Sequence, residues 1–306
     1  MDQYETEKGQ AAAAVVHLPA LQVRRLELIN SRWLAAAAFL AAALWLYAPV
    51  IVKLLRDWWN IPDYSHGFII FPFACALIWN RRRQFAREPL APSIAGLLIA
   101  VASLALLVIG TLGAELFVRR VSLLAFAAGA VVFLFGWRHL RMLLFPFLLI
   151  ALTIPIPAII ITRLTLSLQL SASSMAESLL WLLGIPVLRE GNVLVLPNAT
   201  LQVAEACSGI RSMTALVTLA LIVARFSASN WRPRMLIIAA AIPIAVIVNG
   251  LRVTAAAIGA RWFGAAAVEG AVHEALGWVM FLVAFAMMAA IARICGTSVT
   301  REANAS

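Results

Sequence analysis

The chain is dominated by apolar runs long enough to cross a lipid bilayer, and these runs recur along most of its length. A bilayer core about 30 Å thick is crossed by a helix of roughly 20 apolar residues. Hydrophobic residues make up 63% of the 306 residues, and charged residues only 12%. Lipid offers no partners to backbone N–H and C=O groups, so spanning segments of this kind form helices. The sequence therefore predicts an all-α polytopic membrane protein.

We expect about eight transmembrane helices in this chain. They cover approximately residues 33–54, 65–79, 93–112, 121–137, 140–154, 208–226, 235–262 and 272–294. The predicted transmembrane domain is then residues 33–295. Residues 1–32 and 296–306 are interpreted as N-terminal and C-terminal cytoplasmic tails.

The segment between the fifth and sixth expected helices differs from the rest in composition. Residues 160–183 place leucines at helical spacing among polar side chains, which is typical of an amphipathic helix at a membrane interface. Residues 192–203 are rich in β-branched side chains and break at Pro197-Asn198, which predicts a small β-hairpin.

The basic residues sort to one side of this arrangement. With eight spans, 15 Lys and Arg residues fall on the side of the two termini and 7 on the opposite side, leaving out Arg211 and Arg252 inside helices. Loops that stay in the cytoplasm carry an excess of Lys and Arg, so both termini are predicted to be cytoplasmic. The net charge of +10 lies largely in such loops, and we expect no nucleic-acid partner.

One polar segment, residues 203–212, stands directly before a long apolar run. Cys207 is expected in the first turn of the sixth helix, where free N–H groups and a partial positive charge stabilise a thiolate. Arg211 follows four residues later and shares its helical face. Glu205 and Ser208 flank the cysteine as candidate supporting residues. The plainer alternative is that Cys207 is a small buried apolar residue.

Two later segments also place costly polar residues in or beside apolar helices. Asn249 and Arg252 lie within the seventh expected helix, and His273 begins the eighth. The topology brings all of them to the outer face, together with Cys207. His66, before the second helix, lies at the same face and competes with His273 as acid or base. The simpler structural explanations are that Arg252 is ion-paired or snorkels to the interface, and that His273 is an interfacial loop residue. An arginine inside a membrane span nevertheless suggests a function.

A thiolate, an imidazole and a guanidinium can together perform acyl transfer. The cysteine attacks a carbonyl, the histidine protonates the leaving amine, and the arginine stabilises the oxyanion. Three cysteines without a CxxC motif indicate neither a disulfide framework nor a zinc site, and HExxH is absent. We therefore expect no metal and no cofactor. A transporter, or a membrane component of exopolysaccharide assembly, remains the alternative class.

These motifs resemble the exosortase family over about residues 55–290. The segments that carry the resemblance are Asp63-Tyr64-Ser65-His66-Gly67-Phe68, Ile154-Pro155-Ile156-Pro157, Leu188-Arg189-Glu190-Gly191-Asn192, Glu205-Ala206-Cys207-Ser208-Gly209-Ile210-Arg211-Ser212, Asn249-x-x-Arg252-Val253 and His273-x-x-x-Gly277. The block around Cys207 is the most specific of them.

The resemblance implies a cysteine protease related to transpeptidases, in the inner membrane of Gram-negative bacteria. Its substrates would be exported proteins with a PEP-CTERM tail, which consists of a Pro-Glu-Pro motif, a membrane helix and a basic end. The family roles would make Cys207 the nucleophile, Arg252 the essential arginine and His273 the histidine. Membrane lipid would surround the enzyme, and the active site would face the periplasm.

The charge distribution predicts that residues 158–206 face the periplasm. Reporter fusions after Ala86 and after Asn198 measure this, because suitable reporters are active on only one side of the membrane. We expect a cytoplasmic signal after Ala86 and a periplasmic signal after Asn198. A cytoplasmic signal after Asn198 would put the polar segment on the wrong side and overturn this topology.

Overall fold

The computed structural model describes residues 38, 41–203, 210–228, 230–264 and 270–305; the side chains of 210–212, 271, 273 and 296–305 lie outside this description. The chain divides into two compact units, residues 1–53 and 54–306. The first unit holds most of a helix that runs over Ala41–Asn60. The predicted tail of residues 1–32 lies outside the described part.

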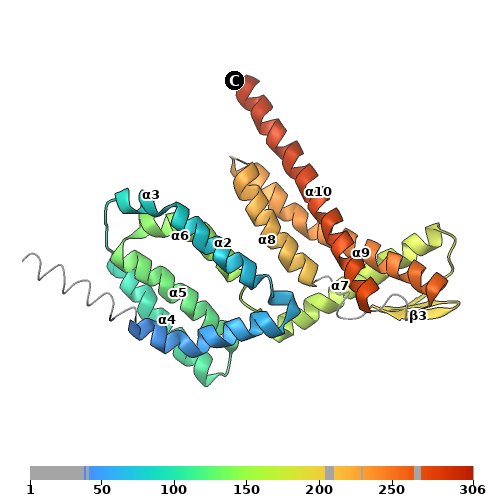
Figure 1. The fold of residues 1–306 in the computed structure, drawn as a ribbon, viewed down its shortest axis with the longest axis horizontal. Coiled ribbons are helices and arrows are strands. Elements are labelled where there is room, and N and C mark those ends of the chain that lie inside the picture. The colour runs from blue at the N-terminus through green and yellow to red at the C-terminus, as the bar shows by residue number, and fades with distance from the viewer. Residues whose placement is uncertain (1–37, 39–40, 204–209, 229, 265–269, 306) are drawn as a thin grey trace, which may run out of the picture. The chain divides into compact units, whose positions relative to one another are not determined.

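The second unit is mostly helical and carries one small sheet (Figure 1). It begins with the end of the helix Ala41–Asn60 and a 3-10 turn, η1 (Pro62–Tyr64). The helices that follow are α2 (Gly67–Asn80), α3 (Arg82–Arg87), α4 (Ile94–Leu112), α5 (Leu116–Leu134), α6 (Trp137–Ala151), α7 (Ala158–Leu182), α8 (Ile210–Ser227), α9 (Trp231–Phe263) and α10 (Gly270–Ala305).

Within the described residues, five helices are long and apolar enough to cross a membrane: α4, α5, α7, α9 and residues 274–295 of α10. The number rises to six if the bent pair Ala41–Asn60 and Pro62–Asn80 is one broken span. Fewer spans than the expected eight are found because three of the expected helices are too short to cross a membrane. α2 and α6 have only 14 and 15 residues, and α8 is also a shorter apolar helix. The chain is nevertheless a multi-pass membrane protein by these helices.

Two helix boundaries differ clearly from the sequence prediction. α5 begins at Leu116 rather than near Val121, so Arg119 and Arg120 belong to a helix and not to a loop. α10 continues as a helix to Ala305, well beyond the expected end near Ile294. The remaining described helices begin and end within a few residues of their predicted positions.

Glycines allow α4 and α5 to pack closely against each other. A Cβ atom added to Gly96 would overlap the backbone of Phe133, and one added to Gly129 would lie 2.8 Å from the backbone nitrogen of Ala100. Close approach at small residues is the usual way in which membrane helices associate, because lipid supplies no hydrophobic force between them. α6 contacts both α5 and α2, which completes this group of helices.

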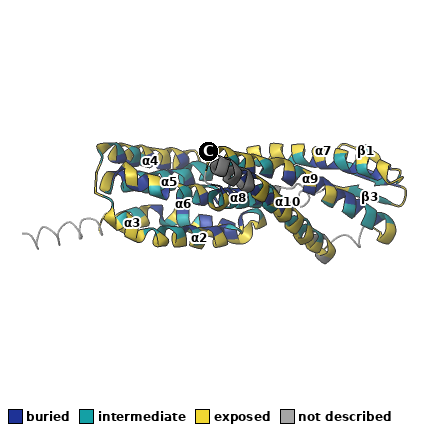
Figure 2. Ribbon diagram, turned by 90° about the horizontal axis from the view of Figure 1, so that it is seen from above, coloured by how far each residue is buried: buried dark blue, intermediate teal, exposed yellow. Residues whose placement is uncertain are grey.

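α9 is the helix on which α7, α8 and α10 all pack. Many of the buried residues at these contacts are alanines, which bring the helix backbones close together. Gly250 serves the contact with α7, because a Cβ atom at this position would overlap the side chain of Met175. Figure 2 shows the buried residues of α9 in dark blue along its length.

α7 buries a narrow stripe that includes two polar side chains, Gln169 and Ser173. Its other surface is exposed and mixes polar residues such as Ser171 and Ser174 with apolar ones such as Leu166. An amphipathic helix at a membrane surface would separate a polar face toward water from an apolar one. α7 was predicted to be such a helix, but it is long and apolar enough to cross a membrane.

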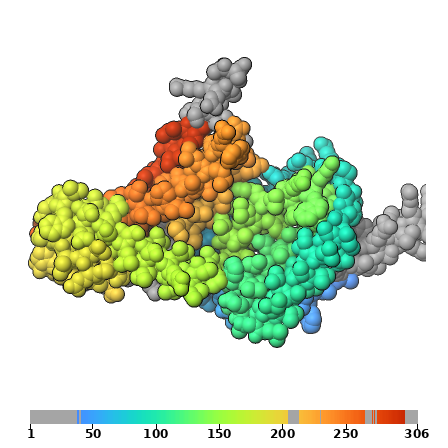
Figure 3. Space-filling model, turned by 180° about the vertical axis from the view of Figure 1, so that it is seen from behind, coloured from blue at the N-terminus to red at the C-terminus, as the bar shows by residue number. Residues whose placement is uncertain are grey.

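The predicted hairpin is confirmed as part of a three-stranded antiparallel sheet. Its strands are β1 (Leu188–Glu190), β2 (Val193–Leu196) and β3 (Ala199–Gln202), in the order β1-β2-β3. Leu196 pairs with Ala199 across the expected turn at Pro197-Asn198. The extra strand β1 pairs its Glu190 with Val193, and the sequence prediction did not include it. Figure 3 shows the strands in yellow and α7 in yellow-green as one continuous surface.

Candidate functional site

Arg252 of α9 packs directly on Gly277 of α10. A Cβ atom added to Gly277 would lie 3.2 Å from Nη2 and 3.4 Å from Cζ of the guanidinium. Glycine therefore gives the planar guanidinium room to lie against the α10 backbone. Because His273 comes one helical turn before Gly277 in the same helix, the fold brings the arginine to the end of α10 that carries the histidine.

A small cavity of about 20 Å³ opens beside this contact. It has room for about one water molecule. Its lining comes from α8, α9 and α10: Leu216, Ala245, Val248, Asn249, Arg252, Gly277, Met280, Phe281 and Ala284. The two polar side chains in this lining, Asn249 and Arg252, are the ones that the sequence singled out in α9. Both are thus placed together at one site.

The position of Cys207 lies outside the described residues, as do those of Glu205 and Ser208. α8 is described from Ile210, three residues after the cysteine, and Arg211 stands in its first turn without a described side chain. Leu216 of α8 lines the cavity together with Arg252. The helix that begins directly after the Cys207 segment therefore contributes to the same cavity.

The turn before α2 packs against α8. η1 contacts α8, and Figure 1 shows it beside the end where α8 begins. His66 follows at the N-terminal cap of α2, and its Nδ1 lies 3.1 Å from the carbonyl oxygen of Asp63. Since a carbonyl only accepts, Nδ1 carries the proton in this contact. The other ring nitrogen, Nε2, is buried and makes no hydrogen bond of normal geometry with the described residues.

Buried polar contacts fix this turn in place. Arg120 of α5 forms an ion pair with Asp57, and their side chains are only 3% and 8% exposed. Trp58 donates its indole N–H to the carbonyl of Thr153 at 2.9 Å. The hydroxyl of Tyr64 accepts the backbone N–H of Ile156 at 3.0 Å.

This support was not predicted from the sequence. Arg120 had been placed in a loop on the outer side, and Asp57 lies beside basic residues at the end of an apolar run, so neither residue pointed to the other. The described residues contain no group of three or more His, Cys, Asp or Glu side chains that could hold a metal ion.

The comparison with protein families decides what kind of protein this is. The family model of the transmembrane exosortases matches residues 58–290. The chain belongs to the transmembrane exosortase family. The matched region of this exosortase begins at Trp58, beside the buried ion pair, and includes η1, the Cys207 segment, Arg252 and the His273 end of α10. No curated protein and no solved structure was found to match the chain.

Arg120→Ala is expected to destabilise the protein strongly. Removing one partner of a buried ion pair typically costs about 3–5 kcal/mol. The matched control is Arg138→Ala, because Arg138 is 66% exposed where it pairs with Glu88. An exposed pair contributes about 0–1 kcal/mol. Denaturant titration of the two detergent-solubilised variants gives the free energies of unfolding, and equal losses would contradict a structural role for the buried pair.

Proposed function

We propose that this exosortase is a membrane cysteine peptidase, related to transpeptidases, that cleaves C-terminal sorting signals of exported proteins. The signal is of the PEP-CTERM type, and the site faces the periplasm at the outer face of the inner membrane. In the eight-span arrangement expected from the sequence, the bias of basic residues toward the side of the termini supports this orientation. The observation that carries the proposal is the packing of Arg252 on Gly277, one turn from His273 and beside α8.

In the proposed reaction, the Cys207 thiolate attacks the carbonyl carbon of the scissile peptide bond. The resulting oxyanion collapses, the C–N bond breaks, and a histidine gives its proton to the leaving amine. The substrate is then held as a thioester on Cys207. Water, or the amine or hydroxyl of an acceptor, attacks the thioester and restores the thiolate.

Arg252 is proposed to stabilise the oxyanion or a substrate carboxylate. Its guanidinium lies between α9 and α10, flat against a glycine, so its donors can be held in a fixed direction. A charged residue at the centre of a span costs about 2.5–3.5 kcal/mol on insertion scales. The positive charge of Arg252 in α9 therefore has a considerable insertion cost. Asn249, one turn earlier and 4% exposed, is a second polar group at the same cavity.

Cys207→Ala is expected to abolish processing of a tagged substrate, because it removes the nucleophile and leaves the helices unchanged. Processing is measured in cells by the size of the substrate at matched enzyme levels. Cys75→Ala and Cys295→Ala are the matched controls, since Cys75 lies within α2 and Cys295 is buried in α10. Full processing by Cys207→Ala would remove the cysteine mechanism.

The two histidines are expected to differ in importance. His273→Ala should remove nearly all cleavage, because His273 shares α10 with the glycine that holds Arg252. His66→Ala should lower the rate only in part. Initial cleavage rates of both variants decide the order. The reverse order would assign proton transfer to His66, whose Nε2 is buried close to η1.

Arg252→Lys is expected to lose most activity, about a hundredfold to a thousandfold, as is typical when an oxyanion donor is removed. Lysine keeps the charge but not the planar fork of donors. Arg211→Lys is the comparison, and it should lose less because Arg211 lies on the same helix as Cys207. Near-normal cleavage by Arg252→Lys would show that charge alone suffices and would exclude a bidentate clamp.

A further inference from the structure

We propose that the outer edge of β3 binds an extended segment of the substrate chain by adding it to the sheet as a fourth strand. This inference rests on the proposed function and names how that site would recognise a polypeptide. Strand addition uses main-chain hydrogen bonds for affinity and leaves the side chains to give specificity.

The register of the sheet identifies which backbone groups of β3 point outward. Leu196 and Ala199 close the two-residue turn, and pairs in an antiparallel ladder alternate between hydrogen-bonded and non-hydrogen-bonded. Val203 continues this alternation, since its N–H donates to the carbonyl of Asn192 at 2.9 Å. The N–H and C=O groups of Thr200 and Gln202 therefore face away from β2. Both residues are exposed, so the groups are accessible.

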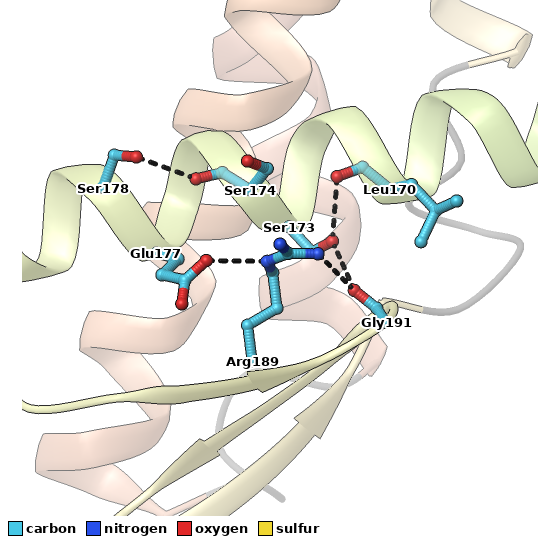
Figure 4. A network of polar contacts seen from close by, with 7 residues as sticks. All are labelled: Leu170, Ser173, Ser174, Glu177, Ser178, Arg189 and Gly191. Atoms are coloured by element: carbon cyan, nitrogen blue, oxygen red, sulfur yellow. Dashed lines mark hydrogen bonds and ion pairs between the residues drawn. The ribbon is translucent and has the colours of Figure 1, made fainter.

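The opposite edge of the sheet is less suited to a partner strand. β1 has three residues, and only Arg189 directs its backbone groups outward. Its side chain is bound to α7 through Nε and Oε2 of Glu177 at 2.6 Å, and Ser173 donates to the carbonyl of Gly191 at 2.9 Å (Figure 4). These contacts fasten β1 and its turn to α7. They make the sheet a fixed platform, and among the described residues β3 is its longer edge without a further partner strand.

β3 also lies on the side of the sheet that contacts α9, the helix that carries Arg252. α9 contacts β2 and β3, whereas α7 contacts β1 and β2. Val203, directly after β3, belongs to the same buried cluster as Val253, the neighbour of Arg252 in α9. Cys207 follows Gln202 by five residues, which span at most about 17–18 Å. A strand added to β3 would thus lie on the α9 side of the sheet, along the strand that comes directly before the Cys207 segment in the chain.

The occupant is inferred to be the extended part of the substrate ahead of its membrane helix. A substrate must present a peptide bond to the nucleophile. An extended strand can do so while its other backbone groups stay hydrogen-bonded to the edge of the sheet. An edge strand that remained open would be a liability for aggregation, which a transient substrate strand would cover during turnover.

Proline substitution tests the edge. Gln202→Pro removes an outward N–H and adds a ring on that side, while it spares the hydrogen bonds to β2. We expect kcat/KM for a reporter protein ending in a Pro-Glu-Pro sorting signal to fall about tenfold or more. Arg189→Pro makes the same backbone change on the β1 edge, and Arg189→Ala removes only its side-chain bond to Glu177. Arg189→Pro should stay within about threefold of Arg189→Ala. A loss in Gln202→Pro no larger than that step would overturn the proposal.

Disulfide trapping tests strand addition to β3 even if Gln202→Pro fails to fold. Thr200→Cys is introduced with Cys75→Ala, Cys207→Ala and Cys295→Ala, and the reporter carries single cysteines at successive positions ahead of its membrane helix. Strand pairing predicts cross-links at every second reporter position, because alternate side chains share a face. Cross-links without this alternation, or none, would overturn strand addition. Retained cleavage by Cys207→Ala would instead overturn the proposed function, so the two failures are distinguishable.

Discussion

The close packing of helices on α9 is the constraint on which the rest of the structure depends. In a membrane there is no hydrophobic force between helices, so association needs backbones that approach closely and polar groups that find partners. α9 meets both needs. Gly250 admits Met175 of α7, and Arg252 lies against Gly277 of α10. A larger residue at Gly250 would displace the side chain of Met175, and one at Gly277 would displace the guanidinium of Arg252.

The sheet is an irregular element beside long apolar helices, and its position follows from the same packing. Leu194 and Leu196 of β2 are buried in one cluster with residues of α7 and of α9. The two buried polar side chains of α7 bind the β1–β2 turn: Ser173 donates to the carbonyl of Gly191, and Gln169 accepts from the side chain of Asn192. Strands at membrane depth are tolerated only where protein covers them or water reaches them. The sheet therefore lies where one face has helices to rest on.

A second source of order is the buried polar support of the turn that carries His66. Asp57 and Arg120 come from helices far apart in sequence, and Trp58 and Tyr64 each bond to backbone at the end of α6. Such contacts are costly to break in an apolar surrounding. They fix the turn beside the start of α8 without using any candidate catalytic group. The residues that hold this turn in place are thus different from the candidate catalytic residues.

The sequence by itself determined the membrane class, most helix positions, the hairpin at Pro197-Asn198 and the family, because hydrophobic length, turn residues and short motifs are local signals. It also singled out Asn249 and Arg252, since polar residues inside apolar runs are costly. Only the tertiary structure decided that α7 buries Gln169 and Ser173, that Arg120 pairs with Asp57, and that Gly277 receives Arg252. Those facts depend on which helices become neighbours, and periodicity along one segment contains no information about the partner that covers it.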